Sequence, residues 1–293
     1  MQQPDDRRTL ESAEAFQGPE YRTFGFLRTW ARVGLLWLPR HQSALLFGAA
    51  WLLIMVVLPI TQRRLGAEAL PRGVTISVLL QLTAVTAILA DAWGWVRVLR
   101  VGVVVVALAW AAEAFGAATG FPFGAYRYTV VLQPQIAHVP LLVPLAWLML
   151  LSPAWAVAQA VLETRLLPEA GFLKGPLPFA LVTALAFTAW DLLLDPHMVA
   201  WGFWVWAAPG GYFGIPWTNF LGWLLVAGLI TLLVRPPPAP VRPFLFIYTI
   251  TWVLEAIGQA FFWHLPGPAV VGGLVVGLFV LLAWRGVARS QMP

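Results

Sequence analysis

Long stretches of apolar residues dominate the chain, and short polar or charged segments separate them. Eight stretches approach the length of about 20 residues that a helix needs to cross a bilayer. They run over residues 43–60, 74–95, 98–115, 139–158, 178–194, 216–234, 244–262 and 268–284. Because they are continuously apolar rather than alternating, they favour helices over a closed barrel. The pattern predicts an all-α, polytopic membrane bundle of about eight spans, which forms a single transmembrane domain over residues 43–293.

The first 42 residues do not follow this pattern. Residues 1–20 are polar and charged, and we expect them to be disordered. Residues 21–42 mix large apolar side chains such as Trp30 with Arg28 and Arg32. This mixture is typical of an amphipathic helix that lies in the membrane interface. We therefore expect an N-terminal interfacial helix ahead of the spans.

Composition and charge agree with a membrane protein. The chain is 60% hydrophobic and 11% charged, whereas soluble domains have about 25% charged residues. It has no cysteine, which excludes disulfides and cysteine nucleophiles. Basic residues gather at the ends of the spans and form no stripe for a nucleic acid. If the N-terminus is inside, only Arg63, Arg64, Arg72 and Arg127 of the 18 Lys and Arg lie outside. The positive-inside rule then predicts an integral protein of a bacterial or archaeal cytoplasmic membrane, with both termini cytoplasmic.

Two aspartates interrupt the fifth apolar stretch. An ionisable residue in a span costs from about 2.5 kcal/mol upward and is therefore a functional candidate. Asp191 and Asp195 are four residues apart, which places both on one helix face. Pro196 disfavours helical geometry in the preceding residue, so we expect the helix to end at Asp195. Burial and the negative end of the helix dipole both oppose ionisation. We expect two proton donors, or one donor beside one anion.

Other polar residues fall in the same layer of the predicted topology. These are Glu113, Glu255, Tyr126, Arg127, Tyr128, His138, His197, Asn219 and His264. The segment 120–128 is rich in glycine, proline and aromatic residues, and we expect it to follow a re-entrant path. Arg127 is the only cation of this layer in the third to eighth spans, so we expect it to form an ion pair with one of the acids.

A short motif occurs twice, and several of these residues also have structural interpretations. Glu113-Ala-Phe-Gly recurs as Glu255-Ala-Ile-Gly, which would fit two four-helix halves related by duplication. The aspartates could pair with Arg127, and the glutamates could hydrogen-bond neighbouring helices. His138 fits an ordinary loop histidine, and Asn219 fits the cap of the sixth span. An interfacial aromatic belt would explain Trp201, Trp204, Trp206 and Trp217.

The chemistry of this polar layer suits protonation of an alkene. The chain has no P-loop, dinucleotide-binding, HExxH or GxSxG motif. No pair of histidines has the spacing of a metal site, so we expect neither metal nor cofactor. A carboxylic acid would donate a proton, aromatic faces would stabilise the carbocation, and a second carboxylate or a histidine would activate water. The substrate would be a long apolar polyene that enters from the lipid.

Four motifs resemble a carotenoid-biosynthesis membrane family that includes the carotenoid 1,2-hydratases of the CruF type. They occupy residues 113–129, 139–147, 189–199 and 214–223, within a region of resemblance over about 107–234. The resemblance implies addition of water across the terminal double bond of an acyclic carotene end, without a redox cofactor. We expect Asp191 or Asp195 to be the acid and the other to be an anion or base. Supporting catalytic candidates are Glu113, Glu255 and His197, and substrate-binding candidates are Arg127, Tyr126, Tyr128, Trp190, Asn219 and Phe123.

Two other functional classes fit the same residues. A carotenoid isomerase or cyclase would begin with the same protonation step and differ in the fate of the carbocation. A non-catalytic carrier or proton-coupled transporter of a lipid or pigment would need polar groups through both halves of the membrane. The inner halves of the predicted spans have few such groups, which favours an enzyme.

Overall fold

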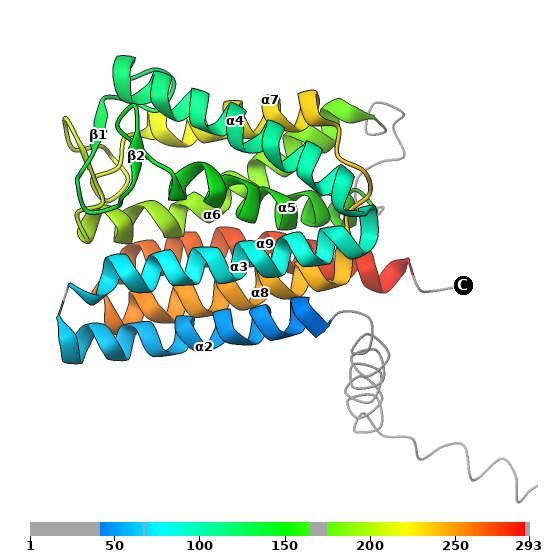
Figure 1. The fold of residues 1–293 in the computed structure, drawn as a ribbon, viewed down its shortest axis with the longest axis horizontal. Coiled ribbons are helices and arrows are strands. Elements are labelled where there is room, and N and C mark those ends of the chain that lie inside the picture. The colour runs from blue at the N-terminus through cyan, green and yellow to red at the C-terminus, as the bar shows by residue number, and fades with distance from the viewer. Residues whose placement is uncertain (1–41, 67, 164–174, 291–293) are drawn as a thin grey trace, which may run out of the picture.

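The computed structural model describes residues 42–66, 68–163 and 175–290. Over these ranges, eight long helices run back and forth along one direction (Figure 1). Each is long and apolar enough to cross a membrane: α2 (Gln42–Leu65), α3 (Ala69–Trp93), α4 (Trp95–Thr119), α5 (Leu142–Leu162), α6 (Pro176–Ala200), α7 (Trp217–Val234), α8 (Val241–Ile257, extended by η2) and α9 (Pro266–Arg289). The prediction of an all-α integral membrane bundle with eight spans is confirmed. The disordered tail and interfacial helix expected in residues 1–42 lie almost entirely outside the described residues.

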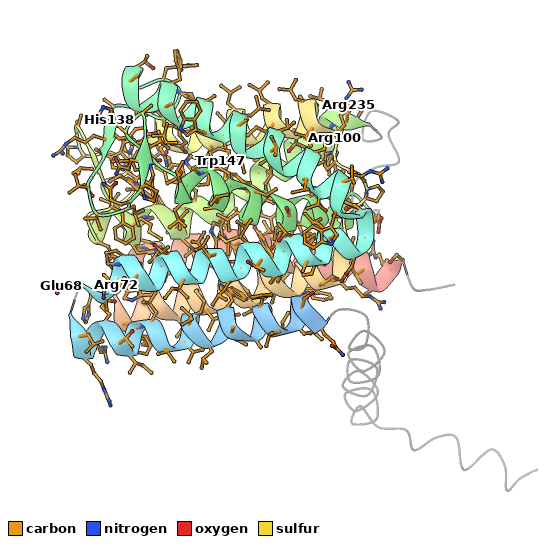
Figure 2. The ribbon with its side chains drawn as sticks, viewed as in Figure 1. Glu68, Arg72, Arg100, His138, Trp147 and Arg235 are labelled. Atoms are coloured by element: carbon orange, nitrogen blue, oxygen red, sulfur yellow. The ribbon has the colours of Figure 1, made fainter. Side chains whose placement is uncertain are left out.

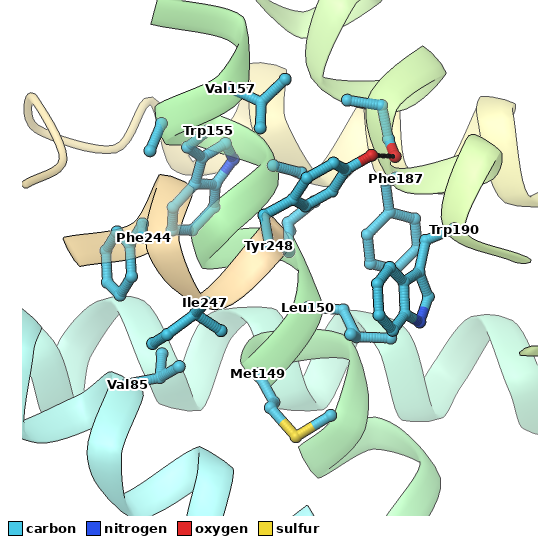
Figure 3. Close-up of a cluster of buried hydrophobic side chains, with 14 of the residues drawn as sticks. Val85, Met149, Leu150, Trp155, Val157, Phe187, Trp190, Phe244, Ile247 and Tyr248 are labelled. Atoms are coloured by element: carbon cyan, nitrogen blue, oxygen red, sulfur yellow. Dashed lines mark hydrogen bonds between the residues drawn. The ribbon is translucent and has the colours of Figure 1, made fainter. Parts of the chain in front are cut away.

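Helix α5 forms the centre of the bundle. It is the most buried of the eight helices, and it packs against α3, α4, α6, α8 and α9. A helix that is apolar on all sides is expected in such a position. Figure 3 shows part of this core, where Trp155 and Val157 lie near Phe244 and Tyr248. The Tyr248 hydroxyl donates a hydrogen bond to the Ala186 carbonyl at 2.8 Å, which joins α8 to α6.

Charged side chains mark the two ends of the bundle. In Figure 2, Glu68 and Arg72 lie at one end and Arg100 and Arg235 at the other, whereas Trp147 lies inside. The predicted second and third spans are separate helices because Gly94 turns the chain between α3 and α4. Its φ of +78° lies in the left-handed region, which glycine adopts without a steric penalty.

Helix α6 does not end at Asp195, so that prediction was wrong. It continues through Pro196 to Ala200. A proline within a helix has no N–H for the carbonyl four residues earlier, which here belongs to Leu192. The Tyr212 hydroxyl donates to that carbonyl at 3.0 Å, and such replacement bonds allow proline within membrane helices. Asp195 and His197 therefore lie on one continuous helix.

Short strands close one end of the bundle, on the left in Figure 1. Strand β1 (Tyr126–Tyr128) pairs antiparallel with β4 (Trp204–Trp206), so that Tyr126 faces Trp206 and Tyr128 faces Trp204. A second pair, β2 (Gln135–Ile136) and β3 (Val139–Pro140), lies in the same loop region. The sequence patterns did not predict these strands. They carry the segment after α4 back over the end of the bundle.

Candidate active site

A buried cavity lies at the end of the bundle that carries β1 and β4. Helices α2 to α8 contribute to its lining, and its volume is about 120 Å³. One water molecule needs about 10–15 Å³ of such space, so the cavity could hold several waters or the end of a hydrocarbon chain. The lining is mostly aromatic and aliphatic. Its strongly polar members are Gln81, Glu113, Asp195, His197, Asn219 and Glu255.

Glu113 holds its carboxylate among three hydrogen-bond donors. Tyr126 and Tyr128 donate to Oε2 at 2.5 and 2.8 Å, and Trp147 Nε1 donates to Oε1 at 3.0 Å. The two tyrosines extend from β1 to Glu113, which lies within α4. The segment 120–128 was expected to turn back toward the spans, and its tyrosine side chains do so. Burial and the nearby Glu113 raise the pKa of both tyrosines above the usual 10. Both hydroxyls therefore remain protonated donors.

The two aspartates are joined by Asn219 at the start of α7. Its Nδ2 atom lies 2.7 Å from Asp191 Oδ2 and 2.7 Å from Asp195 Oδ2. Trp204 Nε1 donates to Asp195 Oδ1 at 2.5 Å. Asp195 lines the cavity, whereas Asp191 lies behind it with Oδ1 buried and without a partner. The shared helix face is thus confirmed, and only Asp195 is directed to the cavity.

His197 and Glu255 form a third polar group. His197 Nδ1 lies 2.9 Å from the Leu193 carbonyl oxygen and 3.6 Å from Glu255 Oε2. Gln259, in the π-helix η2 (Gly258–Phe262), donates to the same carbonyl at 2.7 Å. The imidazole stacks on Trp263 with a centroid distance of 5.1 Å. This group lies on α6, α8 and η2, and it shares no residue with the group of donors around Glu113.

Aromatic rings surround the carboxyl groups. Trp147 stacks on Trp223 with centroids 4.9 Å apart, and Tyr126 packs against Trp206 at 5.2 Å. Phe123 is almost fully buried and meets both Tyr126 and Trp147 edge-on. It fits there because the facing residues, Gly116 and Gly222, lack a Cβ, which would lie 2.6 Å from its ring in either case. Trp190 also lines the cavity.

Arg127 does not lie with the acids, so the expected ion pair is wrong. Side chains alternate between the two faces of a strand, and the register of β1 directs Tyr126 and Tyr128 inward. Arg127, between them, is exposed and pairs with no carboxylate of the part of the chain that the structure describes. His138 is also exposed, in agreement with an ordinary loop histidine. His264 is exposed as well. The catalytic and substrate-binding candidates other than Arg127 are brought together at the cavity, with Asp191 behind its lining.

Several site residues were not identified from the sequence. Trp201, Trp204 and Trp206 were assigned to an interfacial belt, but all three line the cavity, and Trp204 donates to Asp195. Exposed Trp217 still fits that assignment. Trp147 and Gln259 were missed because a tryptophan or glutamine in an apolar span gives no local sign of its partner. Within the described ranges, no three His, Asp or Glu side chains are grouped as metal ligands.

The chain matches the carotenoid biosynthesis protein family over residues 73–279. Among curated proteins, it is similar to bisanhydrobacterioruberin hydratase of Haloarcula japonica, with 33% identity over 138 residues. This alignment covers 46% of the chain and 44% of that relative, so the chain spans less than half the length of the relative. No solved structure matches.

Proposed function

Because the chain belongs to the carotenoid biosynthesis protein family, we propose that it is a carotenoid hydratase. It adds water across the terminal double bond of an acyclic carotene end, and the polyene reaches the cavity from the surrounding lipid. The relative named as a hydratase supports the reaction type. The main structural support is one cavity that combines an acid, a hydrogen-bonded carboxylate and aromatic faces. This combination is what hydration through a carbocation requires.

In this proposal, the aspartate pair supplies the proton. Two nearby carboxyl groups in a low-dielectric site tend to share a proton rather than both ionise. Asn219 holds Asp191 and Asp195 at the same distance from its amide nitrogen. Asp195 is the member that lines the cavity, so it delivers the proton to the less substituted alkene carbon. Asp191 supports it from behind.

Glu113 is the fixed anion that faces the carbocation. An indole N–H can only donate, and the two tyrosine hydroxyls also point at this carboxyl group. Burial opposes ionisation of this carboxyl group, and the three donors favour the ionised form against that effect. An anion that is already oriented before the reaction stabilises developing positive charge without reorganisation. The faces of Trp147, Trp206 and Trp223 add cation–π attraction.

The alternative functions differ from hydration in two ways. An isomerase or cyclase differs in what happens to the carbocation, and a carrier differs because its ligand must cross the membrane. An isomerase or cyclase would lose a proton or close a ring from the same carbocation, so its product would contain no oxygen from water. A carrier needs a polar route across the membrane, whereas the carboxyl groups of the cavity lie toward one end of the bundle. These features support the hydratase, and analysis of the product separates it from the other enzymes.

The proposal is tested by expressing the protein in a host that makes acyclic carotenes and analysing the extracted pigments. The wild type is expected to yield carotene with a tertiary hydroxyl group. Asp195→Asn is expected to lower this product at least about 100-fold, because general acid catalysis contributes about 10²–10⁴. Asp91→Asn is a matched control, because Asp91 is exposed and lies near the end of α3 that is farther from the cavity. Near wild-type product from Asp195→Asn would refute the acid assignment, and unchanged pigment with the wild type would refute the hydratase.

A further inference from the structure

We propose that the cavity wall formed by His197 and Glu255, with Gln259 buried behind it, binds the water that reacts, and that His197 Nε2 is the base that deprotonates it. This inference rests on the proposed hydration, and it assigns the second half of that reaction to a separate part of the cavity. It also assigns a role to Gln259, which the sequence patterns did not indicate.

The hydrogen bonds of His197 determine its tautomer. Nδ1 lies 2.9 Å from the Leu193 carbonyl oxygen, and a carbonyl oxygen can only accept. Nδ1 must therefore carry the hydrogen, which leaves Nε2 of the neutral imidazole with a free lone pair. No hydrogen bond to Nε2 is found within the described residues, and His197 lines the cavity. Nε2 is thus the nitrogen that can accept a proton from water.

Gln259 and two aromatic rings fix this orientation. Gln259 Nε2 donates to the same Leu193 carbonyl at 2.7 Å, and it lies 3.5 Å from His197 Nδ1. Trp263 stacks on one face of the imidazole, and Trp201 meets it edge-on at 4.6 Å. The π-helix η2 places Gln259 here, and such π-helical turns are frequent at functional sites. The imidazole plane is therefore set before any substrate binds.

Two polar atoms at or behind this wall have no hydrogen-bond partner among the described residues. Glu255 Oε2 and Gln259 Oε1 are both buried and accept no hydrogen bond from the described residues. Buried polar groups in proteins nearly always have a partner, which can be an ordered water. A water molecule in the cavity can donate one of its hydrogens to the free lone pair of His197 Nε2. His197 and Glu255 line the cavity beside one another, so this polar part of its wall favours water over hydrocarbon.

Asp195 and His197 are two residues apart on α6, and residues at this spacing do not share a helix face. Both nevertheless line the cavity, so they approach it from different directions. Asp195 protonates one alkene carbon and leaves a tertiary carbocation. The water oxygen bonds to that carbon, and its proton passes to Nε2. Transfer of this proton back to the aspartate pair restores both groups and balances the addition of one water.

The test compares two readouts in deuterated water for His197→Gln, with His138→Gln as the matched control. If His197 acts only after protonation, His197→Gln still forms the carbocation, which returns to alkene. We expect hydroxylated product to fall at least about 100-fold, while recovered carotene gains deuterium at the reacting end. The exposed His138 lies outside the cavity, and its variant is expected to behave as the wild type.

The outcomes distinguish this inference from the hydratase proposal. Loss of both hydroxylation and deuterium exchange in His197→Gln, with the protein still folded in detergent, would overturn the assignment of His197 as the base for water. Unchanged hydroxylation would overturn it as well. If the wild type itself forms no deuterated, hydroxylated product, the hydratase proposal fails instead.

Discussion

The two Glu-Ala-x-Gly segments face the same cavity but hold their carboxyl groups in different ways. Glu113 accepts three hydrogen bonds, whereas Glu255 Oε2 has no hydrogen-bond partner among the described residues. In both segments the glycine receives an aromatic ring from a residue later in the chain. Phe123 packs on Gly116 and Trp263 packs on Gly258.

The difference arises from the path of the chain after each motif. After α4 it returns through β1 and brings two tyrosines to Glu113. After α8 it forms a π-helix and brings Gln259 and Trp263 to His197. Similar motifs therefore acquire different roles, an anion in one wall and part of a water site in the other. The duplication into two four-helix halves stays a prediction, and the shared packing of a ring on glycine is consistent with it.

Glu113→Gln should separate the two carboxyl groups most strongly. The glutamine amide carries no charge. Its NH₂ group would replace one carboxyl oxygen and could not accept a hydrogen bond from the tyrosine or tryptophan donors. We expect activity to fall about 10²–10³-fold, the usual cost of removing one preorganised electrostatic group. Stability should fall by about 1–3 kcal/mol for a donor left unpaired. Product yield and thermal unfolding in detergent measure the two effects, and near wild-type values for both would contradict the role of Glu113 as an anion.

A smaller effect is expected from Glu255→Gln. A carboxyl group and an amide are similar in shape, and Glu255 Oε2 accepts no hydrogen bond from the described residues, so the substitution breaks none at that atom. We expect less than a tenfold loss of product and no measurable loss of stability. The same two assays apply. If Glu255→Gln is as damaging as Glu113→Gln, the proposed difference between the two walls is wrong.

The smallest effect is expected from Arg127→Leu. Arg127 is exposed and forms no ion pair with the cavity carboxylates. Surface substitutions of this kind usually change stability by about 0.5 kcal/mol or less. Product yield should therefore stay within about twofold of the wild type. A loss of activity comparable to that of Glu113→Gln would mean that Arg127 contacts the substrate.

The fold could be predicted from the sequence because a membrane span is a local property of about 20 residues. The layer of acids could be derived from the same spans, and the shared face of Asp191 and Asp195 from helix periodicity. The position of Arg127 depends on the register between β1 and β4, whose partners are about 80 residues apart. The continuation of α6 through Pro196 depends on a hydroxyl from the distant Tyr212. Long-range contacts of this kind leave no local pattern.

Hydration through a carbocation can be followed by supplying the purified protein with an acyclic carotene in water labelled with heavy oxygen and deuterium. The proposal predicts labelled oxygen in a tertiary hydroxyl group and deuterium on the adjacent carbon, in the presence or absence of a metal chelator. A product with deuterium but no labelled oxygen would contradict hydration and indicate an isomerase or cyclase. Loss of the reaction with chelator would show that a metal takes part.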